Sequence, residues 1–411
     1  MNKQQEPRLR FKGFTGTWEE KKLEDIFNTI RNAFVGTATP FYVENGHFYL
    51  ESNNIKNGEI NKKSQIFIND EFYYKQQDKW LKTNDLVMVQ SGHVGHCAVI
   101  PEELNNVAAH ALIIFSNYKL EANPYFLSYQ FQTNSKINEI AKITTGNTIK
   151  HILSSDMKEF AVDFPMVEEQ THLGLFFRRL DSQITESRAV LEKSRQLKKA
   201  MLAKMFPANG EKIPKIRFKG FEGEWESRKL GEMADIVRGA SPRPIQDPKW
   251  FDDNSDIGWL RISDVTIQNG RIHYLEQKIS KAGQGKTRVL EEPHLLLSIA
   301  ASVGKPVINY VKTGVHDGFL VFKNPNFELE FMFQYLDSFL DTWQCYGQPG
   351  TQVNLNSDIV KNADFFIPPN PKEQTAIGNF FCQLDETIAL QSAEVEKLNQ
   401  LKKGLLAAML V

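Results

Sequence analysis

Two stretches of the chain, residues 173–205 and 377–409, repeat apolar positions at alternating steps of four and three residues. The seam residues are Phe177, Leu180, Ile184 and Leu191 in the first stretch, and Phe381, Leu384, Ile388, Val395 and Leu398 in the second. This spacing is typical of coiled-coil heptads. Pro165 and Pro371 lie where helix starts are expected, so the pattern predicts two helices, each roughly 50 Å long.

The two seams have the same phase, which favours pairing of the helices. They would run antiparallel, related by a pseudo-two-fold axis. The alternative is two independent amphipathic helices, each packed only against its own domain.

Short apolar runs outside these helices predict β-strands, for example at residues 85–90, 107–115 and 318–322. A helical pattern follows in two places, near residues 123–143 and 327–343. This alternation favours mixed α+β domains.

The chain also contains an internal duplication. The string RFKGFxGxWE occurs at residues 10–19 and again at 217–226, and EQTxxGxFFxxLDxxI occurs at 169–184 and 373–388. The segment YLESNNIKNGEI, residues 49–60, aligns with WLRISDVTIQNGRI, residues 259–272, if two residues are inserted. The predicted order is a first domain at 1–165, a helix at 166–206, a second domain at 207–367 and a helix at 368–411.

Composition is compatible with this division. The chain has 411 residues, of which 41% are hydrophobic and 24% are charged, and this length suits two or more globular domains. Its N-terminus lacks the apolar core of a secretion signal, and its apolar runs are too short to cross a bilayer. Cys97, Cys345 and Cys382 are scattered, so we expect no disulfide framework and a cytoplasmic location.

The net charge of −1 is low for a nucleic-acid-binding protein, which usually carries a basic excess. Any DNA contact must come from local patches, or from partner proteins that supply phosphate affinity.

Motifs for catalysis are missing from the sequence. It contains no phosphate-binding GxxxxGK[ST] loop, no GxGxxG after a strand, and no Asn/Asp-Pro-Pro-aromatic run of an amino-methyltransferase. His93, His96 and Cys97 could ligate a metal, but the second copy does not repeat them and no fourth ligand is evident. We interpret them as a polar turn and expect no metal site.

The repeated RFKGFxGxWE element could form an aromatic binding platform. We favour a structural role, in which the glycines form turns while Phe14, Trp18, Phe221 and Trp225 pack against the domain.

Polar loops are the better functional candidates, because their residue types hydrogen-bond to base edges and reach phosphates. The frame matches between the two copies, whereas these polar positions differ, as two different targets require. The first-copy candidates are Asn53, Asn54, Lys56, Ser91, His93, Asn147, Thr148 and Lys150. The second-copy candidates are Arg238, Ser241, Arg243, Arg261, Ser263, Asp264, Ser302, Lys305, Thr351, Gln352 and Asn354.

Taken together, the duplicated RFKGFxGxWE entry, the duplicated EQT…FF…LD…I helices and the alternating layout resemble the specificity subunit of type I restriction-modification systems. The resemblance covers essentially the whole chain. It implies two target-recognition domains, each reading one half of a bipartite site in double-stranded DNA. The helices would set the unread gap and dock two methyltransferase subunits.

The same resemblance implies that this chain is not an enzyme and binds no cofactor. Methylation and ATP-driven cleavage would belong to the methyltransferase and the restriction and translocase partners, with S-adenosylmethionine, ATP and Mg²⁺. Helices of roughly 50 Å exceed one turn of B-DNA, about 34 Å, which agrees with two half-sites on one face of the duplex.

Three other functions fit the sequence less well. A stand-alone DNA-binding regulator is disfavoured by the weak basic balance, a fused enzyme by the missing cofactor motifs, and a pure scaffold by the diverged loops.

Overall fold

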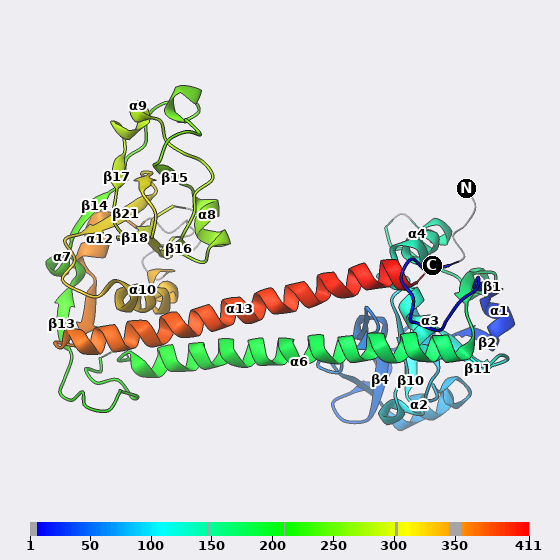
Figure 1. The fold of residues 1–411 in the computed structure, drawn as a ribbon. Helices are drawn as coiled ribbons and strands as arrows, with labels where there is room; N and C mark the ends of the chain where they lie inside the picture. Colours follow the sequence, from blue (N-terminus) through cyan, green and yellow to red (C-terminus); the bar gives the residue numbers. More distant parts are fainter. Residues whose placement is uncertain (1–5, 147, 209, 301–302, 345–354, 411) are drawn as a thin grey trace. The chain divides into compact units, whose positions relative to one another are not determined.

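The computed structural model describes residues 6–146, 148–208, 210–300, 303–344 and 355–410. The chain forms two compact units: unit 1 is Met1–Arg188 with Ala393–Val411, and unit 2 is Ala189–Ser392. Each unit mixes short strands with helices (Figure 1), which confirms the predicted α+β class.

Unit 1 is built around a four-stranded antiparallel sheet in the order β2-β11-β8-β9. Further strands form a second four-stranded sheet, β10-β4-β7-β3, and the pairs β1-β12 and β5-β6. The strands are β1 Glu19–Lys22, β2 Phe27–Asn32, β3 Tyr42–Val43, β4 His47–Glu51, β5 Ile55–Lys56, β6 Glu59–Ile60, β7 Ile66–Ile68, β8 Leu86–Val89, β9 Cys97–Val99, β10 Ala108–His110, β11 Leu112–Tyr118 and β12 Ala161–Phe164. The α-helices outside the long ones are α1 Leu23–Ile26, α2 Asp70–Lys75, α3 Pro124–Gln130, α4 Asn134–Ile143 and α5 Ser154–Lys158.

Unit 2 repeats this plan with a five-stranded sheet, β14-β21-β18-β19-β16, a three-stranded sheet, β15-β20-β17, and the pair β13-β22. Its strands are β13 Glu226–Lys229, β14 Asp235–Arg238, β15 Gly258–Leu260, β16 Arg271–Ile272, β17 Arg288–Leu290, β18 Leu295–Ser298, β19 Pro306–Asn309, β20 Thr313–Val315, β21 Phe319–Lys323 and β22 Asp364–Ile367. Its α-helices are α7 Leu230–Met233, α8 Ile262–Ile267, α9 Lys281–Gln284, α10 Leu329–Ser338, α11 Leu340–Gln344 and α12 Ser357–Asn362. Each helical stretch predicted near 123–143 and 327–343 is therefore two helices.

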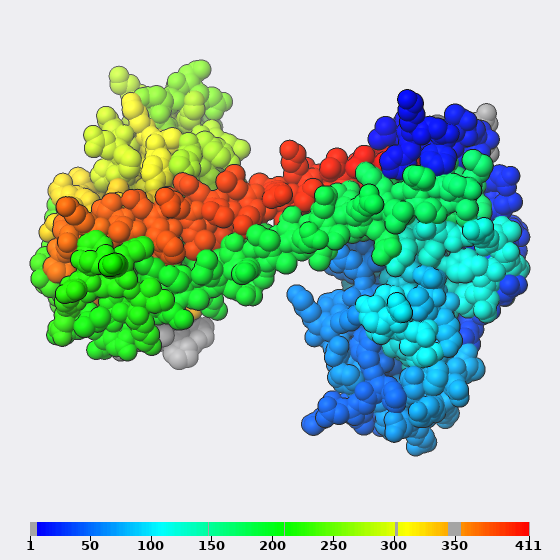
Figure 2. All heavy atoms as spheres, turned by 60° about the horizontal axis from the view of Figure 1, so that its bottom comes forward, coloured from blue at the N-terminus to red at the C-terminus, as the bar shows by residue number. Residues whose placement is uncertain are grey.

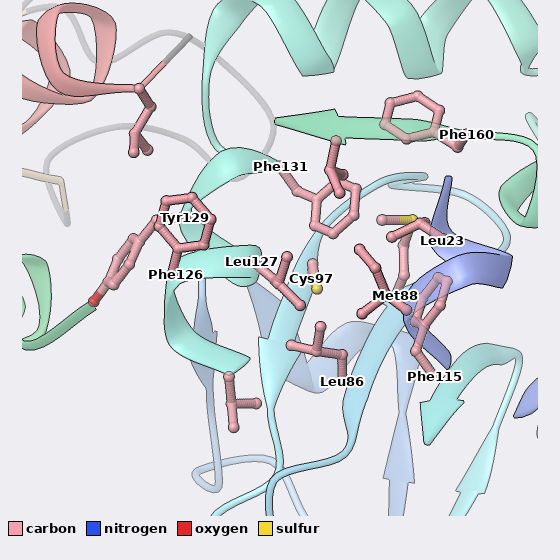
Figure 3. Packing of buried hydrophobic residues seen from close by; sticks show 14 of the residues in the cluster. Leu23, Leu86, Met88, Cys97, Phe115, Phe126, Leu127, Tyr129, Phe131 and Phe160 are labelled. Carbon is pink, nitrogen blue, oxygen red and sulfur yellow. The ribbon is translucent and has the colours of Figure 1, made fainter. Parts of the chain in front are cut away.

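The sequences of the central strands are continuous apolar runs because both faces of each main sheet are buried. In β8, Leu86 and Met88 join one core cluster, while Val87 and Val89 join another on the opposite face. Figure 3 shows the first of these clusters, where β8 and Phe115 of β11 meet side chains of α3.

The two long helices are α6, Val167–Met205, and α13, Pro371–Met409, each of 39 residues. Both begin six residues before the predicted seam starts, because the first turns are polar and carry no apolar period. Their buried glutamines accept hydrogen bonds from the neighbouring domain: Gln170 from the backbone N–H of Asn123 at 2.9 Å, and Gln374 from that of Glu328 at 2.9 Å.

The boundary between the units falls within both helices, so each unit holds the first part of one and the last part of the other. In unit 1, Lys402 pairs with Asp181 at 2.6 Å and Arg188 donates to Asn399 at 2.8 Å. The partner number falls as the α6 number rises, so these segments run antiparallel. In unit 2 the equivalent pair is Lys198 with Asp385, at 2.6 Å.

Burial along the two seams is unequal. In α6, Phe177, Leu180, Ile184 and Leu191 are buried; in α13, Phe381 is buried while Leu384, Ile388, Val395 and Leu398 are half-buried. Leu406, Met409 and Leu410 enter the core of unit 1. Helices packed only against their own domains would not make these contacts, so the contacts favour pairing.

The arginine of each RFKGFxGxWE element binds a glutamate in the first turn of a long helix. Arg10 donates two hydrogen bonds to Glu169, both 2.7 Å, and Arg217 does the same to Glu373 at 2.6 and 2.7 Å. In unit 1 the same segment covers the end of α13 (Figure 2), where the Leu9 N–H donates to Ala408 O at 2.8 Å.

The tryptophans of this element are buried: Trp18 is 3% exposed and Trp225 is 1% exposed. Phe14 and Phe221 are half-buried. These positions support the structural interpretation of the element.

Candidate nucleic-acid interface

Three loops of unit 1 that are distant in sequence lie together. The segment that follows α4, described at residues 145–146 and 148–151, joins the turn after β8, where the Gly92 N–H donates to Lys150 O at 3.1 Å and the Ile152 N–H donates to Gln90 O at 3.0 Å. The β5-β6 hairpin reaches the same turn through the Asn57 N–H, which donates to His96 Nδ1 at 3.3 Å. The described candidates of the first copy therefore lie on three neighbouring loops.

The surface formed by residues 52–58, 91–96, 145–146 and 148–151 carries exposed polar and cationic groups. Its exposed candidates are Asn53, Lys56, His93, Thr148 and Lys150, and Ser91 is half-buried. Burial, followed by the charges of His93 and Lys56, lowers the pKa of His96. The exposed cations of this surface are Lys56 and Lys150, and lysine side chains can reach phosphates.

Asn54 differs from the other candidates because it is only 5% exposed. Its amide donates to Asn61 O and Ser64 O, both at 2.9 Å, and its oxygen accepts from the Glu51 N–H at 2.9 Å. These bonds hold the turn, so Asn54 positions its neighbours and offers nothing to a base.

In unit 2, three candidates, one at the end of β14 and two after it, converge on Asp317. Arg243 pairs with its carboxylate at 2.7 Å, Ser241 donates to it at 2.8 Å, and Arg238 donates to the Asp317 carbonyl at 2.7 Å. Burial acts to raise the pKa of Asp317, but the Ser241 hydrogen bond and the Arg243 charge outweigh it and lower that pKa. These groups form a preassembled cluster in which the Arg243 side chain stays 70% exposed.

The candidates near α8 divide between structural and accessible groups. Arg261 makes two bonds to Asp264, at 2.8 and 3.2 Å, and Asp264 is only 3% exposed, so this pair caps the helix. Ser263 is exposed.

Lys305 points into an ionic cluster at the helices. It pairs with Asp337 at 2.7 Å, and Asp337 also lies 3.7 Å from Lys198 of α6. Lys305 is thereby committed to an internal contact. Asn147, Ser302, Thr351, Gln352 and Asn354 lie outside the described residues.

The possible metal ligands do not assemble. Among the residues that the structure describes, no group of three His, Cys, Asp or Glu side chains is placed to hold a metal ion. Cys97 is buried in the unit 1 core, while His93 is exposed.

The sequence-based candidates did not include Ile267 and Tyr274. These side chains are 68% and 54% exposed on the segment around α8. From sequence alone, an apolar residue is expected to be buried in the core. The signal that could have found them is the two-residue insertion in this segment relative to the first copy.

A duplicated α+β frame that carries different polar loops is the architecture of a two-site recognition protein. A family profile described as "Type I restriction modification DNA specificity domain" matches residues 15–193 and again residues 222–400. The chain belongs to this family.

Individual relatives agree. The chain is 22% identical over 418 residues to the putative type I restriction enzyme MjaX specificity subunit of Methanocaldococcus jannaschii, covering 96% of this chain and 92% of the relative. It is 24% identical over 233 residues to the EcoBI specificity subunit of Escherichia coli, covering 54% and 48%.

Solved structures show the same fold. The S subunit of a type I restriction-modification system from M. genitalium matches with a TM-score of 0.66 at 15% identity, covering 99% of both chains. A chain from a study of type I complex assembly and conformational transition matches with a TM-score of 0.54 at 16% identity, covering 95% and 96%. Among the described residues, no helix combines the length and apolar character that a membrane span requires.

Proposed function

We propose that this chain is the sequence-reading subunit of a type I restriction-modification complex, with unit 1 and unit 2 each reading one half of a split site in double-stranded DNA. The readers would be residues 1–165 and 207–367, and the spacers 166–206 and 368–411. The proposal places the chain in the cytoplasm, where the DNA and the partners are.

The observation that carries the proposal is that the two units share one fold but expose different polar side chains. Both units contain the same two-bond Arg–Glu contact and the same Lys–Asp ion pair between the long helices. Unit 1 then presents Lys56, Thr148 and Lys150, whereas unit 2 presents Arg243 and Ser263. A common frame supplies geometry, and different side chains supply different base and phosphate contacts.

The two long helices suit the spacer and docking role. A helix of 39 residues is about 58 Å long, which exceeds one turn of B-DNA. Their outward faces carry exposed apolar side chains suited to methyltransferase subunits, namely Leu175, Val190, Leu197, Leu390 and Leu401. S-adenosylmethionine, ATP and Mg²⁺ would be bound by those partners and by the restriction and translocase subunits.

The proposal is tested by co-expressing the chain with its candidate methyltransferase subunit and mapping methylated adenines across the host genome. We expect one split motif, two short defined blocks around a fixed unread gap. A complex that forms but methylates no defined site would contradict the proposal.

A further inference from the structure

The segment around α8 in unit 2 and its counterpart in unit 1 share two fixed points. A side-chain oxygen accepts from the backbone N–H three residues earlier, at 2.9 Å in both copies: Asn54 from Glu51, and Asp264 from Arg261. An Asn-Gly pair with positive φ then closes each segment, with φ of 50° at Asn57 and 49° at Asn269. Unit 2 has two more residues between these points than unit 1.

The insertion changes which side chain is buried. In unit 1 the turn is short and Ile55 is only 2% exposed, in the core beside Leu50. In unit 2 the two extra residues lengthen the corresponding turn into α8, and Val265, which is 1% exposed, joins the equivalent cluster beside Leu260. Ile267 is therefore displaced into solvent.

A second large side chain lies on the neighbouring stretch. Gln268 donates to Tyr274 O at 2.8 Å and accepts from the N–H groups of His273 and Tyr274 at 2.8 and 3.2 Å. These bonds hold the backbone of Tyr274 against the residue that follows Ile267. The two exposed apolar side chains thus sit on adjoining stretches of chain.

The segment is anchored at its far end by Arg271. This guanidinium donates to Glu330 of α10 at 2.6 and 3.1 Å and to Asp385 of α13 at 3.0 Å. The Gly270 N–H closes the turn onto Val265 O at 2.9 Å. The exposed side chains are therefore held on a fixed support.

We propose, resting on the proposed function, that Ile267 and Tyr274 read thymine in the half-site of unit 2 through contact with its C5-methyl group. That methyl is the apolar group that base pairs present in the major groove. Ser263, Thr266 and Asn269 are exposed nearby and can hydrogen-bond to neighbouring base edges. The counterpart in unit 1 exposes Asn53 and Lys56, so the two half-sites differ here in chemistry.

A protein partner is the other possible occupant of these two side chains. Stable protein interfaces bury on the order of 800 Å² on each partner, far more than two side chains among polar neighbours supply. DNA, whose base edges offer isolated methyl groups, fits the arrangement better.

The test uses the full chain with its methyltransferase subunit and duplexes of the mapped motif at fixed salt. Each thymine of the unit 2 block is replaced in turn by deoxyuridine, which lacks only the methyl group. Loss of one buried methyl group should weaken wild-type binding about three- to tenfold at one position. Ile267→Ala or Tyr274→Ala should remove that penalty, whereas Ile213→Ala, at an isoleucine 52% exposed in the same unit, should keep it.

A block without thymine, or a uridine penalty unchanged by both variants, would overturn the inference while leaving the proposed function intact. So would variants that weaken methyltransferase capture but keep the uridine penalty, because the patch would then be a protein contact. A wild-type chain without any defined site would instead overturn the proposed function itself, and the inference with it.

Discussion

At the scale of single residues, the copies share buried polar groups that fix the frame. The Arg10–Glu169 fork is the clearest case, because the Glu169 side chain is 2% exposed and the arginine also donates to Gly16 O at 2.6 Å. A charged pair of this kind is sensitive to loss of its geometry, because a buried carboxylate without its fork is costly.

Arg10→Lys should therefore lower the free energy of unfolding of unit 1 by about 2 kcal/mol, because an ammonium cannot make the two-bond fork. Chemical denaturation followed by tryptophan fluorescence measures this. Lys12→Ala, at an exposed position, is the control, and equal stability of the two variants would contradict the structural role.

Asp85 should make unit 1 pH-sensitive. Burial raises its pKa to about 6, against a hydrogen bond from the Lys82 N–H and the Arg31 charge. The folded state then holds the proton more tightly than the unfolded chain. The stability that this proton contributes is present below about pH 4 and is lost as pH rises to about 6, by roughly 3 kcal/mol.

Asp85→Asn should remove this slope and raise stability at pH 7, because the amide oxygen still accepts from Lys82 and carries no charge. Denaturation midpoints between pH 4 and 7.5 test it, with exposed Glu121→Gln as control. A slope that persists in Asp85→Asn would show that another group causes it.

Residue chemistry could be predicted only in part from sequence. The polar loops that contain Lys56, His93 and Lys150 do come together. Arg243 and Ser241 also cluster, but around Asp317, an acid 74 residues from Arg243. A sequence pattern cannot reveal such a distant partner. The same reasoning predicted DNA contacts for Asn54, Asp264 and Lys305, whose side chains instead make hydrogen bonds or ion pairs within the protein.

At the scale of elements, the duplicated Leu-Asp and Leu-Lys-Lys motifs of the long helices pair with each other. Lys402 bonds to Asp181, and Asp181 also accepts from Tyr129 at 2.7 Å. In unit 2, Asp385 accepts from Lys198, Arg271 and Gln334. The equivalent pair is therefore more heavily supported in unit 2.

Lys402→Met should destabilise unit 1 by about 2 kcal/mol, because Asp181 loses its cation in a half-buried site. Lys198→Met should cost about half as much, because Asp385 keeps Arg271. Denaturation of both variants measures the difference. Exposed Lys403→Met should change stability by less than about 0.5 kcal/mol, and an effect equal to that of Lys402→Met would contradict the pairing.

The elements that the sequence predicts best are the long helices, because heptad spacing over many turns is a strong signal. Their first turns are polar and carry no apolar period, but Pro165 and Pro371 indicated where the helices begin. Gln170 and Gln374 hold these turns to the neighbouring domain. Strands of two to four residues, such as β5 and β16, are too short for any period to show. The displacement of Ile267 depends on an insertion, whose structural effect no pattern of hydrophobicity encodes.

At the scale of the whole molecule, duplication is the main design feature, and sequence self-comparison is enough to find it. Each unit has its own core, its own Arg–Glu clamp and its own exposed loops. Each unit should therefore read DNA without the side chains of the other.

The most direct measurement of this claim is a genome-wide methylation map for the wild-type chain and for one loop variant of each unit. Lys56→Ala with Lys150→Ala should relax one block of the split motif about tenfold, since phosphate and base contacts at that block are lost. Arg243→Ala with Ser263→Ala should relax only the other block, and the gap should stay constant in both. Relaxation of both blocks by either variant, or an undivided motif, would contradict two independent readers on one duplicated frame.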